Sequence, residues 1–224
     1  MALRILLVLF FCILSGGCLT DKTCSDQDRT CSSQANLMSL LISAPEGIYM
    51  YSTNTGYNGN LSVLGPGTLD SSLNFICGQQ RLFSNIIDTK CSKYAPLVST
   101  SLVSASSLNA LYSDLPTTGV PIRGPYGTII AQDYSNLFAL DLEVTLEAAG
   151  LGNQTFWSFG DGNGGAAADN CTNGTDDGSL STLGQAGNTL VKTQSSWFAT
   201  DIRGCGELHK ILCLCYVPTA GGGG

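Results

Sequence analysis

The first eighteen residues constrain this chain most, because they direct it into an export pathway and so decide which bonds its cysteines can form. Arg4 precedes an apolar run of about ten residues, small residues follow at positions 15–17, and Cys18 comes next. This order is the three-part layout of a secretory signal. The apolar run is too short to cross the roughly 30 Å of a bilayer core as a helix, which takes about 20 residues. We therefore expect residues 1–17 to be removed and the rest to fold outside the cytoplasm.

Cys18 makes the export signal more specific. The stretch Ser-Gly-Gly-Cys after a leucine resembles, in relaxed form, the lipobox of bacterial lipoproteins. The resemblance implies a diacylglycerol thioether on Cys18, cleavage just before it, and a stable membrane anchor once two or more acyl chains are attached. The alternative is an ordinary signal peptide with Cys18 in a disulfide.

Eight further cysteines follow Cys18, and an even number in an exported chain implies up to four disulfides. They are Cys24, Cys31, Cys77, Cys91, Cys171, Cys205, Cys213 and Cys215. The sequence has no Cys-x-x-Cys pair and a single histidine, His209, so we expect no structural zinc. Cys24 and Cys31 are close enough in sequence to close a small local loop.

Composition limits the classes of partner. The net charge is −7, charged residues make up only 12%, and no cluster of Lys or Arg occurs. Binding of nucleic acid or heparin needs a basic face, so we expect neither partner. The hydrophobic content of 43% favours one packed domain, and 27 glycines favour many turns.

The domain organisation follows from these patterns. We expect a signal peptide at 1–17, a polar lipid-anchored tether at 18–45, a folded domain at 46–217 and a flexible tail at 218–224. Strands are expected at 47–53, 94–101, 121–122, 128–131, 154–159 and 210–217. Short helical turns are expected near 106–112 and 134–140, and a long irregular loop at 160–187, pinned at its middle by a cysteine.

One main helix is expected at 68–83. Its start has capping residues at positions 68 and 70. Its inner face should carry the residues that recur near the helical period, which are Leu69, Leu73, Ile76, Cys77, Gln80 and Phe83.

The order of features matches a known family. Leu108-Asn-Ala-Leu-Tyr-Ser113, then Val120-Pro-Ile122, then Ser135-Asn-Leu-Phe138 resemble the corresponding segments of endostatins, and Phe156-Trp-Ser-Phe-Gly-Asp161 is similar to a strand end of that family. The resemblance implies an α+β fold, the endostatin-like variant of the C-type-lectin fold, with a loop-rich mixed sheet, one main helix and disulfide staples. With the lipobox, the chain resembles the leptospiral endostatin-like outer-membrane lipoproteins.

The resemblance also implies pairings of the cysteines. Two nested bridges, Cys77–Cys213 and Cys171–Cys205, follow from the family. Cys91 and Cys215 are additions to the pattern; Cys215 shares a strand face with Cys213 because side chains alternate with period two, so it could meet Cys91. The histidines and the arginine-rich face through which animal endostatins hold zinc and heparin are absent, so neither activity carries over.

An acidic stretch is the candidate ligand-binding segment. Asp161-Gly-Asn163-Gly-Gly resembles the opening of a calcium loop, and further carboxylates follow nearby. Thr172 stands where such a loop needs glutamate, so a solvated acidic turn is the alternative. The candidate residues are Asp161, Asn163, Asp169, Asp176 and Asp177.

No catalytic constellation stands out. A Gly-x-Ser-x-Gly elbow is absent, and the lone His209 at a strand entrance is typical of a packing or hydrogen-bonding residue. Trp157 and Trp197 are either core anchors or ligand-stacking rings. We expect no cofactor and no enzyme activity.

The expected function is that of a lipid-anchored bacterial surface adhesin. Its domain would bind host extracellular-matrix proteins or complement regulators through irregular loops, mainly 160–188 and 54–67. Two alternatives remain: a carbohydrate- or calcium-binding lectin-like module, and a structural envelope lipoprotein without a host ligand.

Overall fold

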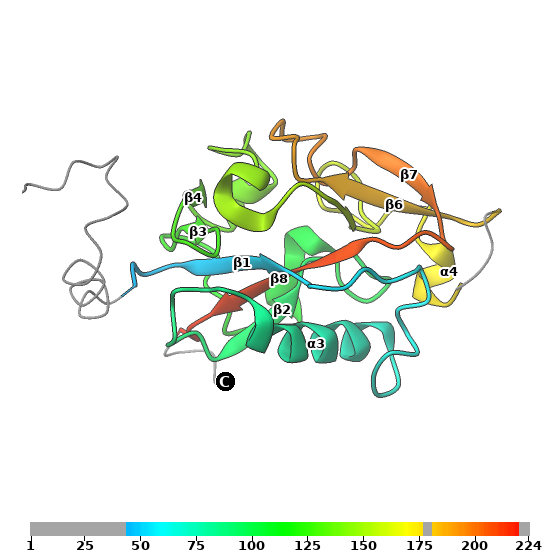
Figure 1. The fold of residues 1–224 in the computed structure, drawn as a ribbon, viewed down its shortest axis with the longest axis horizontal. Coiled ribbons are helices and arrows are strands. Elements are labelled where there is room, and N and C mark those ends of the chain that lie inside the picture. The colour runs from blue at the N-terminus through cyan, green and yellow to red at the C-terminus, as the bar shows by residue number, and fades with distance from the viewer. Residues whose placement is uncertain (1–43, 177–180, 220–224) are drawn as a thin grey trace, which may run out of the picture. The chain divides into compact units, whose positions relative to one another are not determined.

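The computed structural model describes residues 44–176 and 181–219 of the chain. These residues form an α+β domain with a mostly β architecture, one main helix and three disulfides (Figure 1). Cys18, Cys24, Cys31 and Asp177 lie outside the described residues, so the expected lipid site, the Cys24–Cys31 bridge and one acidic candidate have no structural account.

An eight-stranded mixed sheet organises the domain. Seven strands follow the order β4-β3-β1-β8-β5-β6-β7, and β2 joins beside β8. The strands are β1 (Ile48–Ser52), β2 (Lys93–Pro96), β3 (Ile122–Arg123), β4 (Ile129–Ala131), β5 (Thr155–Trp157), β6 (Leu183–Asn188), β7 (Asp201–Gly204) and β8 (Lys210–Tyr216).

Strand β8 is the centre of this sheet, and Figure 1 shows it crossing the middle of the domain beside β1. It pairs antiparallel with β1 and β2, and parallel with β5 at Phe156↔Lys210. Its sequence, Lys-Ile-Leu-Cys-Leu-Cys-Tyr, is apolar after the first residue and buried from Ile211 onward. A strand with neighbours on both edges and cover on both faces needs such a sequence.

Alternation along β1 and β8 creates two cores. Ile48 and Met50 of β1 share one core with Leu212 and Leu214 of β8. The opposite core holds the tyrosines of β1 with Ile211, Cys213 and Cys215 of β8. Successive side chains of a strand point to opposite faces, so one central strand contributes to both.

Helix α3 (Leu69–Gln80) covers the cysteine-bearing face and packs against β2 and β8. It begins at Thr68 with a capping box: the Thr68 hydroxyl accepts from the Ser71 amide, and the Ser71 hydroxyl accepts from the Thr68 amide. Gly78 is required where the helix meets β2, because an added Cβ would lie 2.7 Å from the Tyr94 ring. The expected helix is therefore present, but it ends at Gln80.

The early end of α3 corrects one expectation. Residues 81–83 form the 3₁₀ turn η1 (Arg81–Phe83), and Phe83 is 63% exposed rather than on the inner helix face. A 3₁₀ turn has three residues per turn, so the register that buries Leu73 and Ile76 no longer holds there. Gln80 also differs from expectation, since its side chain accepts a hydrogen bond from the Asn54 amide at 2.9 Å.

Short helical segments complete the domain. Most cover the disulfide-free face, where Leu108, Leu137 and Leu146 are buried. The segments are η2 (Ala105–Ala110), η3 (Ser135–Leu137), η4 (Glu147–Leu151) and α4 (Cys171–Gly174).

The three described disulfides join the pairs expected from the sequence. Cys77 of α3 is bonded to Cys213, Cys91 to Cys215, and Cys171 of α4 to Cys205. Each loop-closing bridge stabilises a domain by typically about 2–4 kcal/mol. Two of the three therefore fasten helix α3 and the segment after it to the central strand.

Segment 160–187 is not one long loop, contrary to expectation. It contains the single turn α4 and the start of β6, which pairs with β5 and β7. In α4 the backbone has φ near +50° at Cys171 and at the next two residues, a left-handed turn pinned by the Cys171–Cys205 bridge. Strand β7 was also missed, and the expected strand at 94–101 is only the four residues of β2.

Among the described residues, no helix is long and apolar enough to cross a membrane.

Candidate functional site

The acidic loop after β5 is held by its own carboxylate. Asp161 Oδ1 accepts hydrogen bonds from the Asn163 amide at 2.9 Å and the Gly165 amide at 2.8 Å. An aspartate that bonds the backbone two residues on is a common way to stabilise a turn. Asp161 therefore shapes the loop.

The side chains of two other candidates in this stretch are engaged with other partners. Asn163 Oδ1 accepts from Gln194 Nε2 at 3.1 Å, and Asp176 Oδ2 accepts from the Thr182 hydroxyl at 2.6 Å. The Asp169 carbonyl accepts from the Gln185 amide, which ties this stretch to β6. Within residues 44–176 and 181–219, no group of three or more His, Cys, Asp or Glu side chains is arranged to hold a metal ion.

His209 lies in the interior at the entrance to β8. Its Nδ1 is 2.6 Å from the Thr155 hydroxyl, its ring meets Trp157 edge-on, and Glu207 Oε2 is 3.6 Å from its Nε2. Burial lowers the pKa of His209, against the opposing effect of the Glu207 carboxylate. The imidazole is enclosed, since His209 is only 6% exposed, whereas the Glu207 side chain is 42% exposed. We interpret the contact between Thr155 and His209 as a packing contact that holds β5 against the start of β8.

Both tryptophans are fully buried core residues. Trp157 donates its indole N–H to the Tyr57 carbonyl at 2.8 Å, and Trp197 stacks on Phe138 with ring centroids 5.6 Å apart. Neither ring is available to stack on a ligand.

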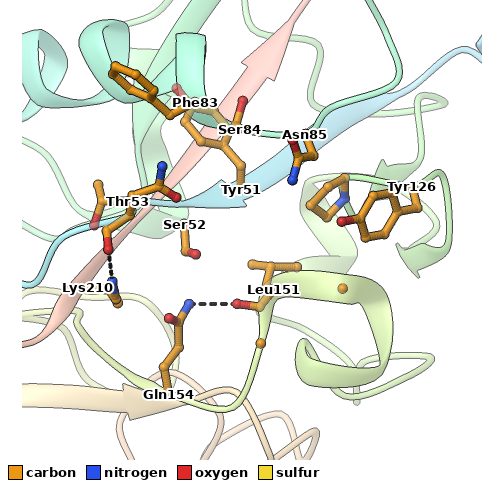
Figure 2. A pocket seen from close by; sticks show the side chains of 14 residues that line it. Tyr51, Ser52, Thr53, Phe83, Ser84, Asn85, Tyr126, Leu151, Gln154 and Lys210 are labelled. Carbon is orange, nitrogen blue, oxygen red and sulfur yellow. Dashed lines mark hydrogen bonds between the residues drawn. The ribbon is translucent and has the colours of Figure 1, made fainter.

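A polar cleft opens where β1 ends and β8 begins, as Figure 2 shows. Its volume is about 280 Å³. Lys210 Nζ donates to the Asn54 carbonyl, and Gln154 Nε2 donates to the Leu151 carbonyl at 2.8 Å, so both side chains are fixed along its floor. Phe83 and Tyr126, both well exposed, stand at its rim.

A second hollow lies on the outward side of α3, and we call it the helix groove. It has a volume of about 530 Å³, and its lining residues are Pro66, Ser71, Asn74, Phe75, Gly78, Gln79, Leu82 and Tyr94. None of these residues carries a charge. Leu82 is 84% exposed and Phe75 is 44% exposed.

The loop before α3 extends the helix groove. Val63 and Leu64 of this loop are exposed, and the backbone at Gly65 approaches Phe75 so closely that an added Cβ would lie 3.2 Å from the Phe75 Cβ. The loop 54–67, expected from the sequence to carry recognition, therefore meets α3 at this surface. A chain of exposed apolar side chains beside a hollow is typical of a protein-contact surface.

The helix groove was not found from the sequence. Its one signal was that Phe75 and Leu82 lie off the apolar period of the helix expected at 68–83, on the side opposite Leu73 and Cys77. A single exposed apolar side chain is common on any protein, so this signal is weak until the groove is seen.

Comparison with known proteins adds no identification. No protein-family model matches the chain, and no curated protein sequence matches it.

Proposed function

We propose that this chain is a lipid-anchored bacterial surface adhesin whose folded domain binds host matrix proteins or complement regulators without catalysis. The observation that carries the binding role is the uncharged helix groove with Phe75 and Leu82 at its surface. Interfaces between proteins have cores that are depleted of charge and rich in apolar and aromatic groups. The groove has this composition, in a chain with net charge −7.

The proposed contact also has a rigid support. Cys77 on the inner side of α3 is bonded to Cys213 of the central strand, and the helix start is capped. A binding surface on a fastened helix loses little conformational entropy when a partner docks, which favours affinity. The loop 54–67 supplies the adjoining contacts. The acidic loop is a weaker candidate, since Asp161 is engaged in holding its own turn.

Replacing the exposed groove leucine tests the proposal. In solid-phase binding to a panel of matrix proteins and complement regulators, Leu82→Ser should weaken binding by on the order of tenfold, because a few side chains near the centre of an interface carry most of its binding energy and each costs more than about 1 kcal/mol when truncated. Folding stability should stay within about 0.5 kcal/mol, since Leu82 is a surface residue. Leu140→Ser is the matched control, because Leu140 is also exposed but lies outside the groove. Equal binding by all three proteins would place the contact elsewhere.

The anchor rests on the residues around Cys18 alone. Cys18→Ala should abolish incorporation of labelled fatty acid and move the protein from the membrane to the soluble fraction of cells. Unchanged membrane partition of this variant would contradict the lipoprotein assignment. Protease treatment of intact cells then separates an adhesin from a structural envelope lipoprotein, because only a surface-facing domain is cleaved.

We propose the endostatin-like variant of the C-type-lectin fold for this domain. Its support is the cysteine order, with one bridge from the main helix to the last strand and a second from the acidic segment to Cys205. An experimental structure tests this assignment by superposition on an endostatin. A match limited to α3 and β8 would be against it.

The polar cleft supports a second candidate, a lectin-like site for a carbohydrate. Aromatic rims at Phe83 and Tyr126 suit the apolar face of a sugar ring, and the Ser52 hydroxyl and Asn85 amide suit its hydroxyl groups. Within the described residues neither of these two polar side chains has a hydrogen-bond partner. Glycan-array binding that Tyr126→Ala removes and Leu82→Ser preserves would favour this function. Calorimetry with calcium decides whether a metal takes part.

A further inference from the structure

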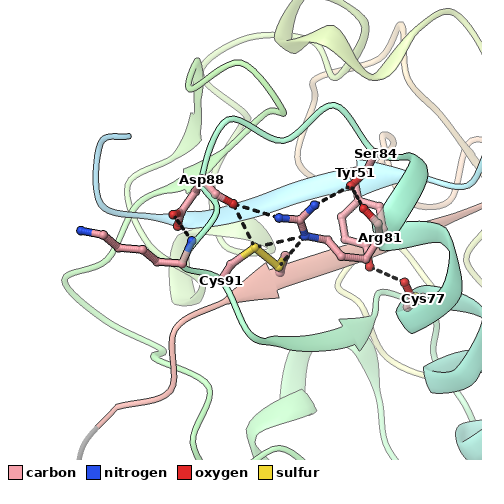
Figure 3. Close-up of a disulfide and its surroundings, with 8 residues drawn as sticks. Tyr51, Cys77, Arg81, Ser84, Asp88 and Cys91 are labelled. Atoms are coloured by element: carbon pink, nitrogen blue, oxygen red, sulfur yellow. Dashed lines mark hydrogen bonds between the residues drawn. A yellow bond between two sulfur atoms is a disulfide. The ribbon is translucent and has the colours of Figure 1, made fainter. Parts of the chain in front are cut away.

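The Cys91–Cys215 bridge differs from the other two in having a cation on its sulfur atoms. Arg81 Nε lies 3.3 Å from Cys91 Sγ and 3.3 Å from Cys215 Sγ. Figure 3 shows the guanidinium directed at the disulfide from the end of α3. Nothing of this kind occurs at the bridges of Cys77 and Cys171, where no Lys or Arg of the described segments donates to a sulfur.

Arg81 is held in this position by its other donors. Its Nη2 donates to the Asp88 carbonyl at 2.9 Å, and its Nη1 reaches the Ser84 hydroxyl at 3.5 Å. The guanidinium therefore connects the segment between η1 and β2 to the Cys91–Cys215 disulfide at the end of that segment. A planar group with several donors keeps its direction better than a single ammonium does.

The two sulfur-bearing residues differ in access. Cys91 is 8% exposed, whereas Cys215 and the four cysteines of the other bridges are fully buried. Cys91 is therefore the one cysteine of the described disulfides with any surface open to solvent, which makes its side of the bridge the side that an external thiolate approaches.

We propose that Cys91–Cys215 is a thiol-exchange site, open to low-molecular-weight dithiols and thiols, with Arg81 stabilising the thiolate that leaves. An external thiolate attacks Cys91 Sγ and forms a mixed disulfide with it. The bond between the two protein sulfurs breaks, and its electron pair goes to Cys215 Sγ, which leaves as a thiolate beside the Arg81 guanidinium. A nearby cation favours the thiolate form of a cysteine, and a better leaving thiolate speeds exchange.

The second half of the exchange completes the electron balance. The other thiol of a dithiol reagent attacks its own sulfur in the mixed disulfide, and Cys91 is released as a thiolate that takes up a proton. The reagent is oxidised to its disulfide, and the protein gains two electrons and two protons as Cys91 and Cys215 thiols. A monothiol such as glutathione needs a second molecule for this step, so it should accumulate on Cys91.

The fold confines the effect of this exchange to one segment. Cys213 stands two residues before Cys215 on β8 and stays bonded to Cys77, so α3 remains fastened to the central strand. When the Cys91–Cys215 bridge opens, the segment 84–91 is no longer bonded to β8, but the Arg81 contact to the Asp88 carbonyl remains. The domain should thus remain folded when this bridge alone is open.

The experiment is graded reduction of the folded, full-length protein with dithiothreitol, without denaturant. Acid quenching, alkylation and peptide mass mapping report each described bridge separately. We expect Cys91 and Cys215 to be alkylated at reductant concentrations that leave the other four described cysteines oxidised, with circular dichroism unchanged. With glutathione in place of dithiothreitol, the adduct should be on Cys91. Simultaneous opening of the three bridges, or earlier opening of another, overturns the proposal, as does an adduct on Cys215.

Two variants separate the charge of Arg81 from its structural contacts. Arg81→Gln should slow opening of the bridge by on the order of tenfold, the rate equivalent of one charge-assisted hydrogen bond. Ser84→Ala removes a contact of Arg81 but keeps the cation at the sulfurs, so its opening rate should equal or exceed that of the unaltered protein. If Arg81→Gln opens as fast as the unaltered protein or faster, the guanidinium only holds the segment, and its role in exchange is disproved.

Discussion

The two faces of the central sheet are stabilised in different ways, although the same strands supply both. On one face, Leu212 and Leu214 of β8 pack among aliphatic side chains and an aromatic group that includes Trp197 and Phe198. On the other face, the same strand presents Cys213 and Cys215, and all six paired cysteines of the described domain lie in that core.

The difference shows where covalent bonds are needed. The disulfide-free core has more buried side chains, contributed by many short segments, and Phe138, Phe156, Trp197 and Phe198 form one connected group of rings in it. The stapled core is smaller, and its helical cover is α3 with the single turn α4. Small cores bury too little apolar area to offset conformational entropy, and disulfides compensate by restricting the unfolded chain. We therefore expect mutations to act differently on the two faces.

Truncating the disulfide-free core should have the largest effect. Leu214 is fully buried at the centre of β8, so Leu214→Ala should lower the free energy of unfolding by about 2–5 kcal/mol. Leu208→Ala is the control, since Leu208 is 69% exposed and should change stability by less than about 0.5 kcal/mol. Urea denaturation measures both. A loss for Leu214→Ala no larger than that of the control would show that this core does not stabilise the fold.

Removing the helix staple should have the next largest effect. The double variant Cys77→Ala/Cys213→Ala loses the bridge from α3 to β8, and its free energy of unfolding should fall by about 2–4 kcal/mol. The difference in the free energy of unfolding between the variant and the unaltered protein should disappear when both are denatured in strong reductant, because both then lack the bridge. A gap of equal size in oxidised and reduced protein would assign the effect to lost packing.

The smallest effect at neutral pH is expected from the buried histidine of the stapled side. Burial lowers the pKa of His209 in the folded protein, while the unfolded chain has a pKa of about 6.5. Below pH 6.5 the unfolded chain binds a proton at this position that the folded protein does not. The contribution of neutral His209 to the free energy of unfolding is therefore fully present above pH 6.5 and is lost as the pH is lowered from 6.5 through the folded pKa.

Comparison of the protein with His209→Gln measures this contribution. Between pH 7.5 and pH 5.5 the unaltered protein should lose more stability to acid than the variant does, whatever their difference at pH 7.5. Parallel stability curves in that range would mean that another group accounts for the acid sensitivity.

Much of the stapled face could be predicted from the sequence, because its signals are local. Thr68 and the apolar period through Leu73 and Cys77 indicate α3, and the run from Lys210 to Tyr216 indicates a buried strand. The Cys77–Cys213 and Cys171–Cys205 bridges were expected from a resemblance in cysteine order, and Cys91–Cys215 from the alternation of side chains along the last strand; the structure contains all three.

Strand β6 could not be predicted, because its sequence is Leu-Gly-Gln-Ala-Gly-Asn. Glycine is needed at two of its positions because residues far away in the sequence pack closely against the backbone there. An added Cβ at Gly184 would lie 2.6 Å from the Cys171 sulfur, and one at Gly187 would lie 2.2 Å from the Phe156 ring. The side chains that fill the space above this strand belong to other elements, so no local pattern marks it.

The candidate site shows the same limit. Asp161 was expected either to bind a ligand or to belong to a solvated acidic turn, and in the structure its carboxylate holds the turn. A metal-binding role depended on further carboxylates, which the fold does not gather around it within the described residues. The helix groove depended on where α3 ends and on how the loop 54–67 returns to the helix, where Gly65 approaches Ser72 and Phe75, and such long-range packing leaves no local pattern in the sequence.

The central position of β8 dictates an order of events during synthesis. Ribosomes release the chain from its amino terminus, so β1, β2 and α3 emerge long before the strand that joins them. Cys77 and Cys91 wait for partners 136 and 124 residues away, while Cys171 needs one only 34 residues away. In an oxidising compartment the two early cysteines are each other's nearest partners until β8 arrives. A non-native disulfide between Cys77 and Cys91 is thus the mispairing expected before β8 is available. Formation of the native bridges should then depend on a disulfide isomerase.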